Sequence, residues 1–342
     1  MAEPSQPRRR LSPLGTAAAV VGLALFAWTI REAGFGAVVD GVGRVGWGFL
    51  PIVALAGLRF LVRAWAWTLC SDAMPPLRIR DTFPAMVAGD TLGNLTPLGL
   101  ILSEPAKAAF VRPRVTLMQA LASIALENIF YTETVALVIA AGTVALLFVF
   151  DVHDALRQAS LVGLGLTIAV VVAGTIVLTR RLTIAGSALA WLDRRGLLPA
   201  AIAGRLGKLA TLEDQVVGFA SRHPGRVLPI LGVEMLFHAL GVVEVWITLG
   251  LLLGASAPTL LTTFLLEAVN RTITVVFKFV PLRLGVDEAG TEIVTRTLGL
   301  PMGVGVTMAI VRKVRMLFWA AVGVALLARR GLSPTLETID ER

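Results

Sequence analysis

Long apolar runs separated by short polar links dominate this 342-residue chain. A helix needs about 20 mostly apolar residues to cross a hydrocarbon core of roughly 30 Å. Six runs meet this requirement: 13–31, 46–66, 117–148, 159–179, 227–253 and 303–328. The pattern predicts an all-α polytopic integral membrane protein. The first run is longer than the apolar core of a signal peptide, so we expect a retained span.

Basic residues at the ends of these runs predict the orientation in the membrane. They form clusters at Arg8 to Arg10, Arg78/Arg80, Arg112/Arg114, Arg180/Arg181, 194–226 and Arg329/Arg330. The links 32–45, 149–158 and 254–258 carry few basic residues. Cytoplasmic loops are enriched in Lys and Arg. The pattern therefore predicts a bacterial inner-membrane protein with both termini in the cytoplasm.

Two further stretches are apolar but broken. Residues 82–112 begin and end beside cytoplasmic arginines, and Pro97 and Gly99 interrupt them. Residues 257–300 begin and end at basic-poor links, and Pro281 and Gly285 interrupt them. Irregular backbone at membrane depth is tolerated only where protein buries it or water lines it. We expect two re-entrant hairpins that enter from opposite sides.

The two breaks resemble each other in sequence. Pro97 to Glu104 reads PLGLILSE and Pro281 to Glu288 reads PLRLGVDE. Similar interrupted segments in two halves are typical of inverted-repeat transporters, whose substrate lies between the halves. The predicted halves are 10–179 and 227–330. Between them, 180–226 fits either an amphipathic helix on the cytoplasmic membrane surface or a plain connector helix.

Many charged or ionisable residues lie inside the apolar runs. An ionised group at the bilayer centre costs at least about 2.5–3.5 kcal/mol, so it requires a partner or a task. The set comprises Glu104, Lys107, Glu127, Glu234, His238, Glu244, Glu267, Arg271, Lys278, Asp287, Glu288, Glu292, Arg296, Arg312, Lys313 and Arg315. A water-filled polar cavity between the halves would account for them together.

Structural roles compete with functional ones at several of these positions. Glu267 and Arg271 are one helical turn apart, which favours an ion pair. Glu234 and His238 have the same spacing, and a mutual hydrogen bond competes there with a proton relay. Lys313 is expected to reach lipid headgroups.

Arg312 and Arg315 share one helix face, and arginine binds phosphate with two parallel hydrogen bonds. A phospholipid headgroup carries such a phosphate. We therefore expect these two arginines to bind the headgroup.

Composition excludes several function classes. The chain is 56% hydrophobic and 16% charged, which excludes a soluble fold. Its net charge of +8 follows the ends of apolar runs, so we expect no nucleic acid partner. One Cys and three dispersed His predict no metal site, and we expect no cofactor. No Gly-x-x-x-x-Gly-Lys-Ser/Thr loop occurs, so we expect passive or ion-coupled transport.

Several of these residues also resemble a known family. They are Asn94, Pro97, Glu104 and Glu127 near the first break, and Pro281, Gly285, Val286 and Glu288 at the second. The chain is similar over about residues 10–330 to the transmembrane flippase-like domain of the lysylphosphatidylglycerol synthases. The resemblance implies movement of a lipid between leaflets without the synthase activity. Leu282 and Arg283 replace two glycines of the family pattern, which favours a specialised branch handling hopanoids or polyprenyl-linked lipids.

The sequence thus predicts a lipid flippase that is not an enzyme. The headgroup would contact Glu104, Glu288, Arg312 and Arg315, with further substrate-binding candidates at Asn94, Pro97, Lys107, Glu127, Arg271, Pro281 and Asp287. Glu127, Glu234 and His238 are candidates for proton coupling. The expected partner is an anionic phospholipid or an isoprenoid-type lipid. The sequence leaves open whether the protein forms a homo-oligomer. Two alternatives are a membrane enzyme acting on a lipid-linked substrate and a membrane partner that docks a lipid-modifying enzyme through 180–226.

Overall fold

The described part of the chain is built from helices. The computed structural model describes residues 36, 43, 45–95, 99–149, 154–197, 206–256, 258–277, 280, 283 and 285–329. The predicted first span, 13–31, lies outside them. The α-helices are α3 (Phe49–Leu69), α4 (Ile79–Leu95), α5 (Gly99–Val111), α6 (Leu117–Val149), α7 (Asp154–Arg180), α8 (Ile184–Arg194), α10 (Leu206–Arg222), α11 (Pro224–Leu253), α12 (Leu260–Val276), α13 (Val286–Thr297) and α14 (Val304–Arg329). Two 3₁₀ turns, η1 (Gly46–Gly48) and η2 (Gly254–Ser256), complete the elements, and these ranges contain no strand.

Four described segments are long and apolar enough to cross a membrane. They are Gly46–Leu69, Leu117–Val149, Ser160–Arg180 and Pro224–Leu253. Each coincides with a span predicted from the sequence, so the chain is a multi-pass membrane protein. The predicted span 303–328 also forms a helix, the 26-residue α14. Three basic residues near its middle, Arg312, Lys313 and Arg315, set α14 apart from the four by composition.

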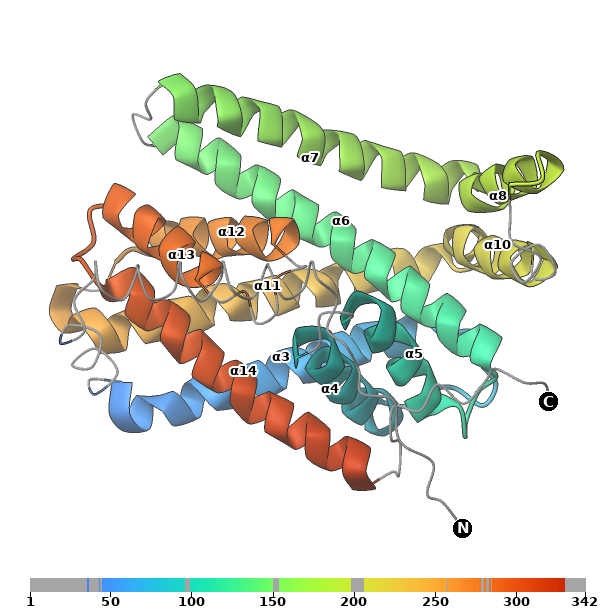
Figure 1. The fold of residues 1–342 in the computed structure, drawn as a ribbon, viewed down its shortest axis with the longest axis horizontal. Helices are drawn as coiled ribbons and strands as arrows, with labels where there is room; N and C mark the ends of the chain where they lie inside the picture. The colour runs from blue at the N-terminus through green and yellow to red at the C-terminus, as the bar shows by residue number, and fades with distance from the viewer. Residues whose placement is uncertain are drawn as a thin grey trace, which may run out of the picture.

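Short helix pairs occupy the two interrupted stretches. The first stretch forms α4 and α5, of 17 and 13 residues, and the second forms α12 and α13, of 17 and 12 residues. Each of these helices is shorter than the roughly 20 residues that span a hydrocarbon core. Figure 1 places α4 and α5 towards the end of the bundle that carries α10, and α12 and α13 towards the opposite end.

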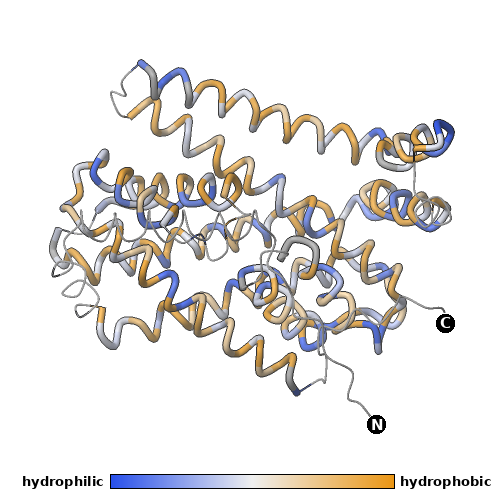
Figure 2. Tube along the Cα trace, viewed as in Figure 1, coloured by the Kyte–Doolittle hydropathy of each residue, from blue (hydrophilic) through white to orange (hydrophobic). Residues whose placement is uncertain are grey.

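The longest helices set the architecture. α6 and α7 run side by side as an antiparallel pair along one edge, while α3 and α11 pack together beneath them (Figure 1). α14 crosses this layer and packs on α4 and α13. Apolar residues predominate along the long helices (Figure 2).

Small residues let some of these helices approach closely. A Cβ atom at Gly57 of α3 would lie 2.5 Å from the Trp319 ring of α14. One at Gly323 of α14 would lie 2.0 Å from Thr91 Oγ1 of α4. In lipid, helix association depends on such close packing rather than on the hydrophobic effect. These contacts hold α14, with its basic centre, against the first half of the chain.

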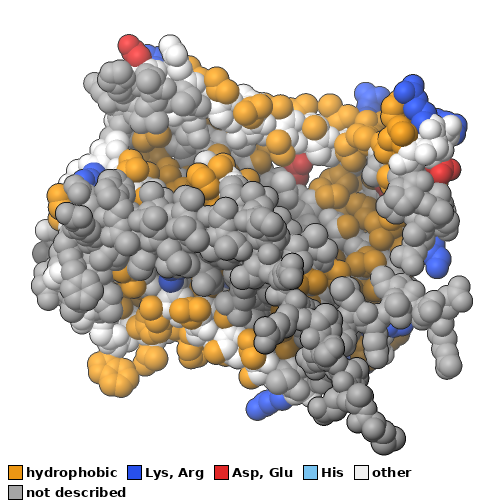
Figure 3. All heavy atoms as spheres, in the orientation of Figure 1, with side chains coloured by type: hydrophobic (Ala, Val, Ile, Leu, Met, Phe, Trp, Pro, Cys, Tyr) orange, Lys and Arg blue, Asp and Glu red, His pale blue; other side chains and the backbone are white. Residues whose placement is uncertain are grey.

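The segment between the halves forms two amphipathic helices, α8 and α10. α10 buries Val216, Val217 and Phe219 on one side and packs on α6, α7 and α11. Lys and Arg side chains gather on the surface at this end of the molecule, whereas apolar side chains cover the visible side of α7 (Figure 3). The helix expected from the sequence pattern is therefore present over 206–222.

Candidate functional site

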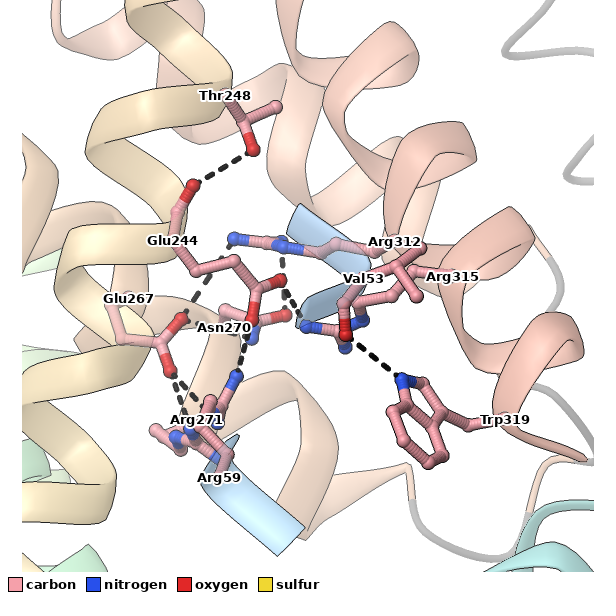
Figure 4. A network of polar contacts seen from close by, with 10 residues as sticks. All are labelled: Val53, Arg59, Glu244, Thr248, Glu267, Asn270, Arg271, Arg312, Arg315 and Trp319. Atoms are coloured by element: carbon pink, nitrogen blue, oxygen red, sulfur yellow. Dashed lines mark hydrogen bonds and ion pairs between the residues drawn. The ribbon is translucent and has the colours of Figure 1, made fainter. Parts of the chain in front are cut away.

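Four arginines from three helices meet in the interior of the bundle (Figure 4). They are Arg59 on α3, Arg271 on α12, and Arg312 and Arg315 on α14. Arg59 lies at the centre of the 21-residue α3. At 1.5 Å per residue it is about 15 Å from either end of that helix. A helix that crosses the bilayer would therefore hold Arg59 near the middle of the apolar layer.

Two carboxylates lie between these arginines. Glu244 Oε2 of α11 accepts a hydrogen bond of 2.8 Å from Arg59 Nη1, and its Oε1 accepts one from Arg315. Glu244 is 3% exposed, so this is an interior ion-pair set rather than a surface one. We call the four arginines, Glu244, Glu267 and Asn270 the arginine cluster.

Glu267 of α12 is the second carboxylate. Its Oε1 accepts a hydrogen bond of 2.5 Å from Arg271 Nη2, which confirms the intrahelical pair expected from the spacing. Arg59 and Arg312 lie farther away, each with a nitrogen 3.9 Å from a Glu267 oxygen. The direct hydrogen bond of Arg312 goes to Asn270 Oδ1 at 3.0 Å, a neutral acceptor.

Gly241 of α11 makes room for this pair. A Cβ atom at Gly241 would lie 2.6 Å from Glu267 Oε1 and 3.2 Å from Arg271 Nη2. The absence of a side chain therefore lets the Glu267–Arg271 pair lie directly against the α11 backbone.

Phe237 of α11 connects the cluster to a second set of charges. Its ring centroid lies 4.4 Å from the Arg59 guanidinium, 5.0 Å from that of Arg271 and 5.8 Å from that of Arg63. Such contacts are attractive because the ring face is electron-rich. Arg63 is one helical turn beyond Arg59 on α3.

Arg63 forms a separate ion pair with Glu127 of α6. Arg63 Nε and Nη2 donate to Glu127 Oε1 at 2.9 and 2.5 Å. The Arg63 guanidinium also lies 4.0 Å from the Tyr131 ring centroid. Glu127 is 1% exposed. The residue thus has a structural partner, which the sequence prediction did not include.

Glu234 and His238 do not form the mutual hydrogen bond expected from their spacing. Both carboxylate oxygens of Glu234 are buried without a hydrogen-bond partner among the described residues, and the side chain is fully enclosed. His238 Nε2 instead lies 3.2 Å from Thr134 Oγ1 of α6. Glu234 lies within electrostatic range of Glu127 and Arg63. Inter-helix packing, which spacing along one helix does not reveal, decides the partners here.

The chain matches the family described as lysylphosphatidylglycerol synthase TM region over residues 15–323. The match covers nearly the whole sequence. The protein belongs to this family. Neither the curated proteins nor the solved structures contain a significant match. As a member of the lysylphosphatidylglycerol synthase TM family, the chain is a membrane protein related to lipid metabolism.

The predicted site residues of the first break lie apart from the arginine cluster. Glu104 pairs with Lys107 on α5, with Nζ 3.0 Å from Oε1. Asn94 on α4 donates to Asp90 Oδ2 at 2.8 Å. Glu104 is one-third exposed, whereas Lys107 is buried. In this family member these contacts stay within the α4–α5 pair.

Lys313 faces the interior and not the lipid headgroups expected from the sequence. Its Nζ lies 2.6 Å from Glu288 Oε1 and 3.7 Å from Asp287 Oδ2. Asp287 also accepts a hydrogen bond from Arg283 at 3.2 Å. Glu288 Oε2 accepts one from the backbone N–H of Gly285 at 2.8 Å, which caps α13. Asp287 and Glu288 therefore anchor α13 to α14 and do not join the arginine cluster.

The remaining predictions concern features outside the arginine cluster. Pro97 and Pro281 lie outside the described residues. A cavity of about 290 Å³ is present, but its lining includes Cys70, Ser123 and Phe219, on the α10 side of the molecule. The described residues contain no group of His, Cys, Asp or Glu arranged to hold a metal ion.

Two interior arginines of α3 were not among the residues predicted from the sequence. Arg59 and Arg63 are the charged residues of the predicted span 46–66, one helical turn apart. Their isolation in an apolar helix was the available signal, because a charge inside a span requires a partner. Glu244 and Glu267 were recognised as interior charges, but their pairing across α3, α12 and α14 requires the fold.

Proposed function

We propose that this protein moves an anionic lipid between the leaflets of the bacterial inner membrane. The headgroup would pass the arginine cluster while the acyl chains stay in the bilayer. According to this proposal, the protein is a transporter and changes no covalent bond of the lipid. The family membership supports a role with lipids.

The arginine cluster is the observation that carries the proposal. Its arginines come from α3 in the first half of the chain and from α12 and α14 in the second. A charged headgroup crosses hydrocarbon only at a large cost, which polar protein groups at mid-depth reduce. Guanidinium groups also match the geometry of phosphate oxygens.

The two short helix pairs fit the same proposal. If α4–α5 and α12–α13 are re-entrant hairpins, each enters the membrane and leaves it on the same side. Inverted-repeat transporters carry their substrate between such elements. In this orientation the basic end with α8 and α10 faces the cytoplasm, as the distribution of basic residues favours.

Proton movement is a candidate driving force. Glu234 is enclosed and lacks a hydrogen-bond partner among the described residues, and it lies near the Arg63–Glu127 pair. Ionisable side chains inside membrane helices form the proton relays of many pumps and transporters, which makes Glu234 a candidate for that role. Glu127 and His238 are the other two candidates for proton coupling, and both are buried.

Leaflet exchange in proteoliposomes tests the proposal. Labelled phosphatidylglycerol, its aminoacylated form, a hopanoid, a polyprenyl phosphate and phosphatidylcholine would be compared, with and without a proton gradient. Arg312→Gln is the test variant. Arg329→Gln is the matched control, because it removes the same charge from the exposed end of the same helix.

The proposal expects exchange of an anionic lipid by the wild type and Arg329→Gln, and at least a tenfold slower rate with Arg312→Gln. Exchange no faster than in empty liposomes for every lipid, with or without the gradient, would contradict it.

A further inference from the structure

The arginine cluster contains more positive than negative side chains. Four arginines surround two glutamates, which leaves two positive charges uncompensated within the cluster (Figure 4). Arginine stays protonated in proteins under all ordinary conditions. Burying unmatched charge is unfavourable unless another group neutralises it. The cluster therefore has the charge balance of an anion site.

Neighbouring carboxylates are engaged by cations of their own. Glu127 pairs with Arg63, and Glu288 pairs with Lys313. Asp287 is shared between Arg283 and Lys313. Among the described residues, these flanking sets hold as many cations as anions, so they do not offset the surplus. Glu234 would offset one charge only when ionised.

Hydrogen-bond donors in the cluster are also unused. Arg59 Nε, Arg271 Nε and Arg312 Nη2 are buried without a hydrogen-bond partner among the described residues. Arg271 is 6% exposed, so bulk water does not supply the missing acceptor. Leaving a buried charged donor unpaired costs more than leaving a neutral one unpaired. Surplus charge and unused donors thus occur on the same arginines.

We infer that the arginine cluster binds a phosphate monoester, whose headgroup carries up to two negative charges and three acceptor oxygens. Two negative charges equal the surplus, and oxygens of one phosphate can accept from several guanidinium groups. A phosphodiester carries one negative charge and would leave one of the two surplus positive charges uncompensated. A zwitterionic headgroup adds no net charge and leaves all of it.

This inference deepens the proposed function and rests on it only for the lipid part of the ligand. Access supports it: Arg315 and Arg312 have side chains 19% and 12% exposed, so the α14 side of the cluster reaches the surface. A phosphate on a lipid and a free phosphate share the chemistry that the cluster recognises. The two sources differ in whether acyl chains add affinity.

Equilibrium binding to detergent-solubilised full-length protein tests the inference without any transport step. Calorimetry would compare dioctanoyl phosphatidic acid, dioctanoyl phosphatidylglycerol, dioctanoyl phosphatidylcholine and inorganic phosphate at pH 8. We expect phosphatidic acid to bind at least tenfold more tightly than phosphatidylglycerol, and phosphatidylcholine not to bind. Inorganic phosphate binding as tightly as phosphatidic acid would support the site and identify a soluble phosphate compound as its ligand.

Three variants test whether binding depends on the surplus positive charge of the cluster. Arg312→Gln should weaken phosphatidic acid binding at least tenfold, and Arg329→Gln should leave it unchanged. Glu244→Gln raises the surplus from two to three and should tighten binding severalfold. Unfolding midpoints of all variants would be measured alongside, so that the sign of the Glu244→Gln effect remains decisive if Arg312→Gln does not fold.

Equal affinity for phosphatidic acid and phosphatidylglycerol would overturn the inference, as would no binding of any anion at millimolar concentration. Weaker binding by Glu244→Gln in a folded protein would also overturn it. Binding as expected together with no leaflet exchange would retain the site and reject the transport proposal.

Discussion

At the scale of single residues, Glu127 and Glu234 are a matched pair with opposite environments. Glu127 accepts two hydrogen bonds from Arg63, whereas Glu234 accepts none among the described residues. Both are almost fully buried. We therefore expect the carboxylate to stabilise the fold at Glu127 and to be dispensable for stability at Glu234.

Substitution by glutamine separates the two roles. Glu127→Gln leaves Arg63 without its counter-ion, and breaking a buried ion pair costs about 3–5 kcal/mol. Glu234→Gln removes no hydrogen bond and replaces an ionisable group with a neutral one. We expect the unfolding midpoint in detergent to fall by several degrees for Glu127→Gln and to stay level or rise for Glu234→Gln. Equal decreases would show that Glu234 also has a structural partner.

Gly241 offers a test of cluster geometry that leaves every charge in place. Gly241→Ala places a methyl group 2.6 Å from Glu267 Oε1, so the Glu267–Arg271 pair must move. Side-chain ends move at low cost, so we expect a near-normal unfolding midpoint but at least tenfold weaker phosphatidic acid binding. Gly232→Ala is the control. Gly232 lies on the same helix as Gly241, and a Cβ atom there would meet nothing within 4 Å. Similar affinities for both variants would contradict the placement of the cluster.

At the scale of helices, hydrophobic pattern predicted four spans that the structure confirms, because length and apolarity are local properties. Arg312 and Arg315 were also placed on one face by helical spacing alone. Lys313 shows the limit of that reasoning: its direction on α14 was known, but α13 covers that direction. Which partner a residue meets depends on helices distant in sequence. Arg59 and Glu244, for example, form a hydrogen bond although they are 185 residues apart.

The α13–α14 contact makes its own prediction. Lys313→Met leaves Glu288 and part of Asp287 uncompensated in the interior, so the unfolding midpoint should fall by several degrees. Glu288→Gln retains a capping oxygen for the Gly285 N–H but removes a charge. The double variant should therefore recover much of the loss, giving a favourable coupling in a double-mutant cycle of unfolding midpoints. Additive losses would mean that Lys313 and Glu288 act independently.

At the scale of the whole molecule, the two short helix pairs lie towards opposite ends of the bundle (Figure 1). An inverted arrangement requires the ends of each pair to emerge on one side of the membrane, and the two pairs to emerge on opposite sides. Exposed residues flank both pairs. Met74 precedes α4 and Arg112 follows α5. Leu260 begins α12 and Met302 follows α13.

Single cysteine substitutions at these four positions, reacted with a membrane-impermeant maleimide in intact cells, test the arrangement. The natural Cys70 interferes little, because burial raises the pKa of its thiol and so suppresses the reactive thiolate. Leu260→Cys and Met302→Cys should be labelled from outside, and Met74→Cys and Arg112→Cys only after permeabilisation. Labelling of Met74→Cys and Arg112→Cys from opposite sides would make α4–α5 a single broken span. All four on one side would remove the inverted relation between the halves, and with it the argument that the cluster lies between two oppositely facing hairpins. The expected pattern would give the two hairpins opposite orientations, which is the inverted relation that places a substrate site between the two halves of a transporter.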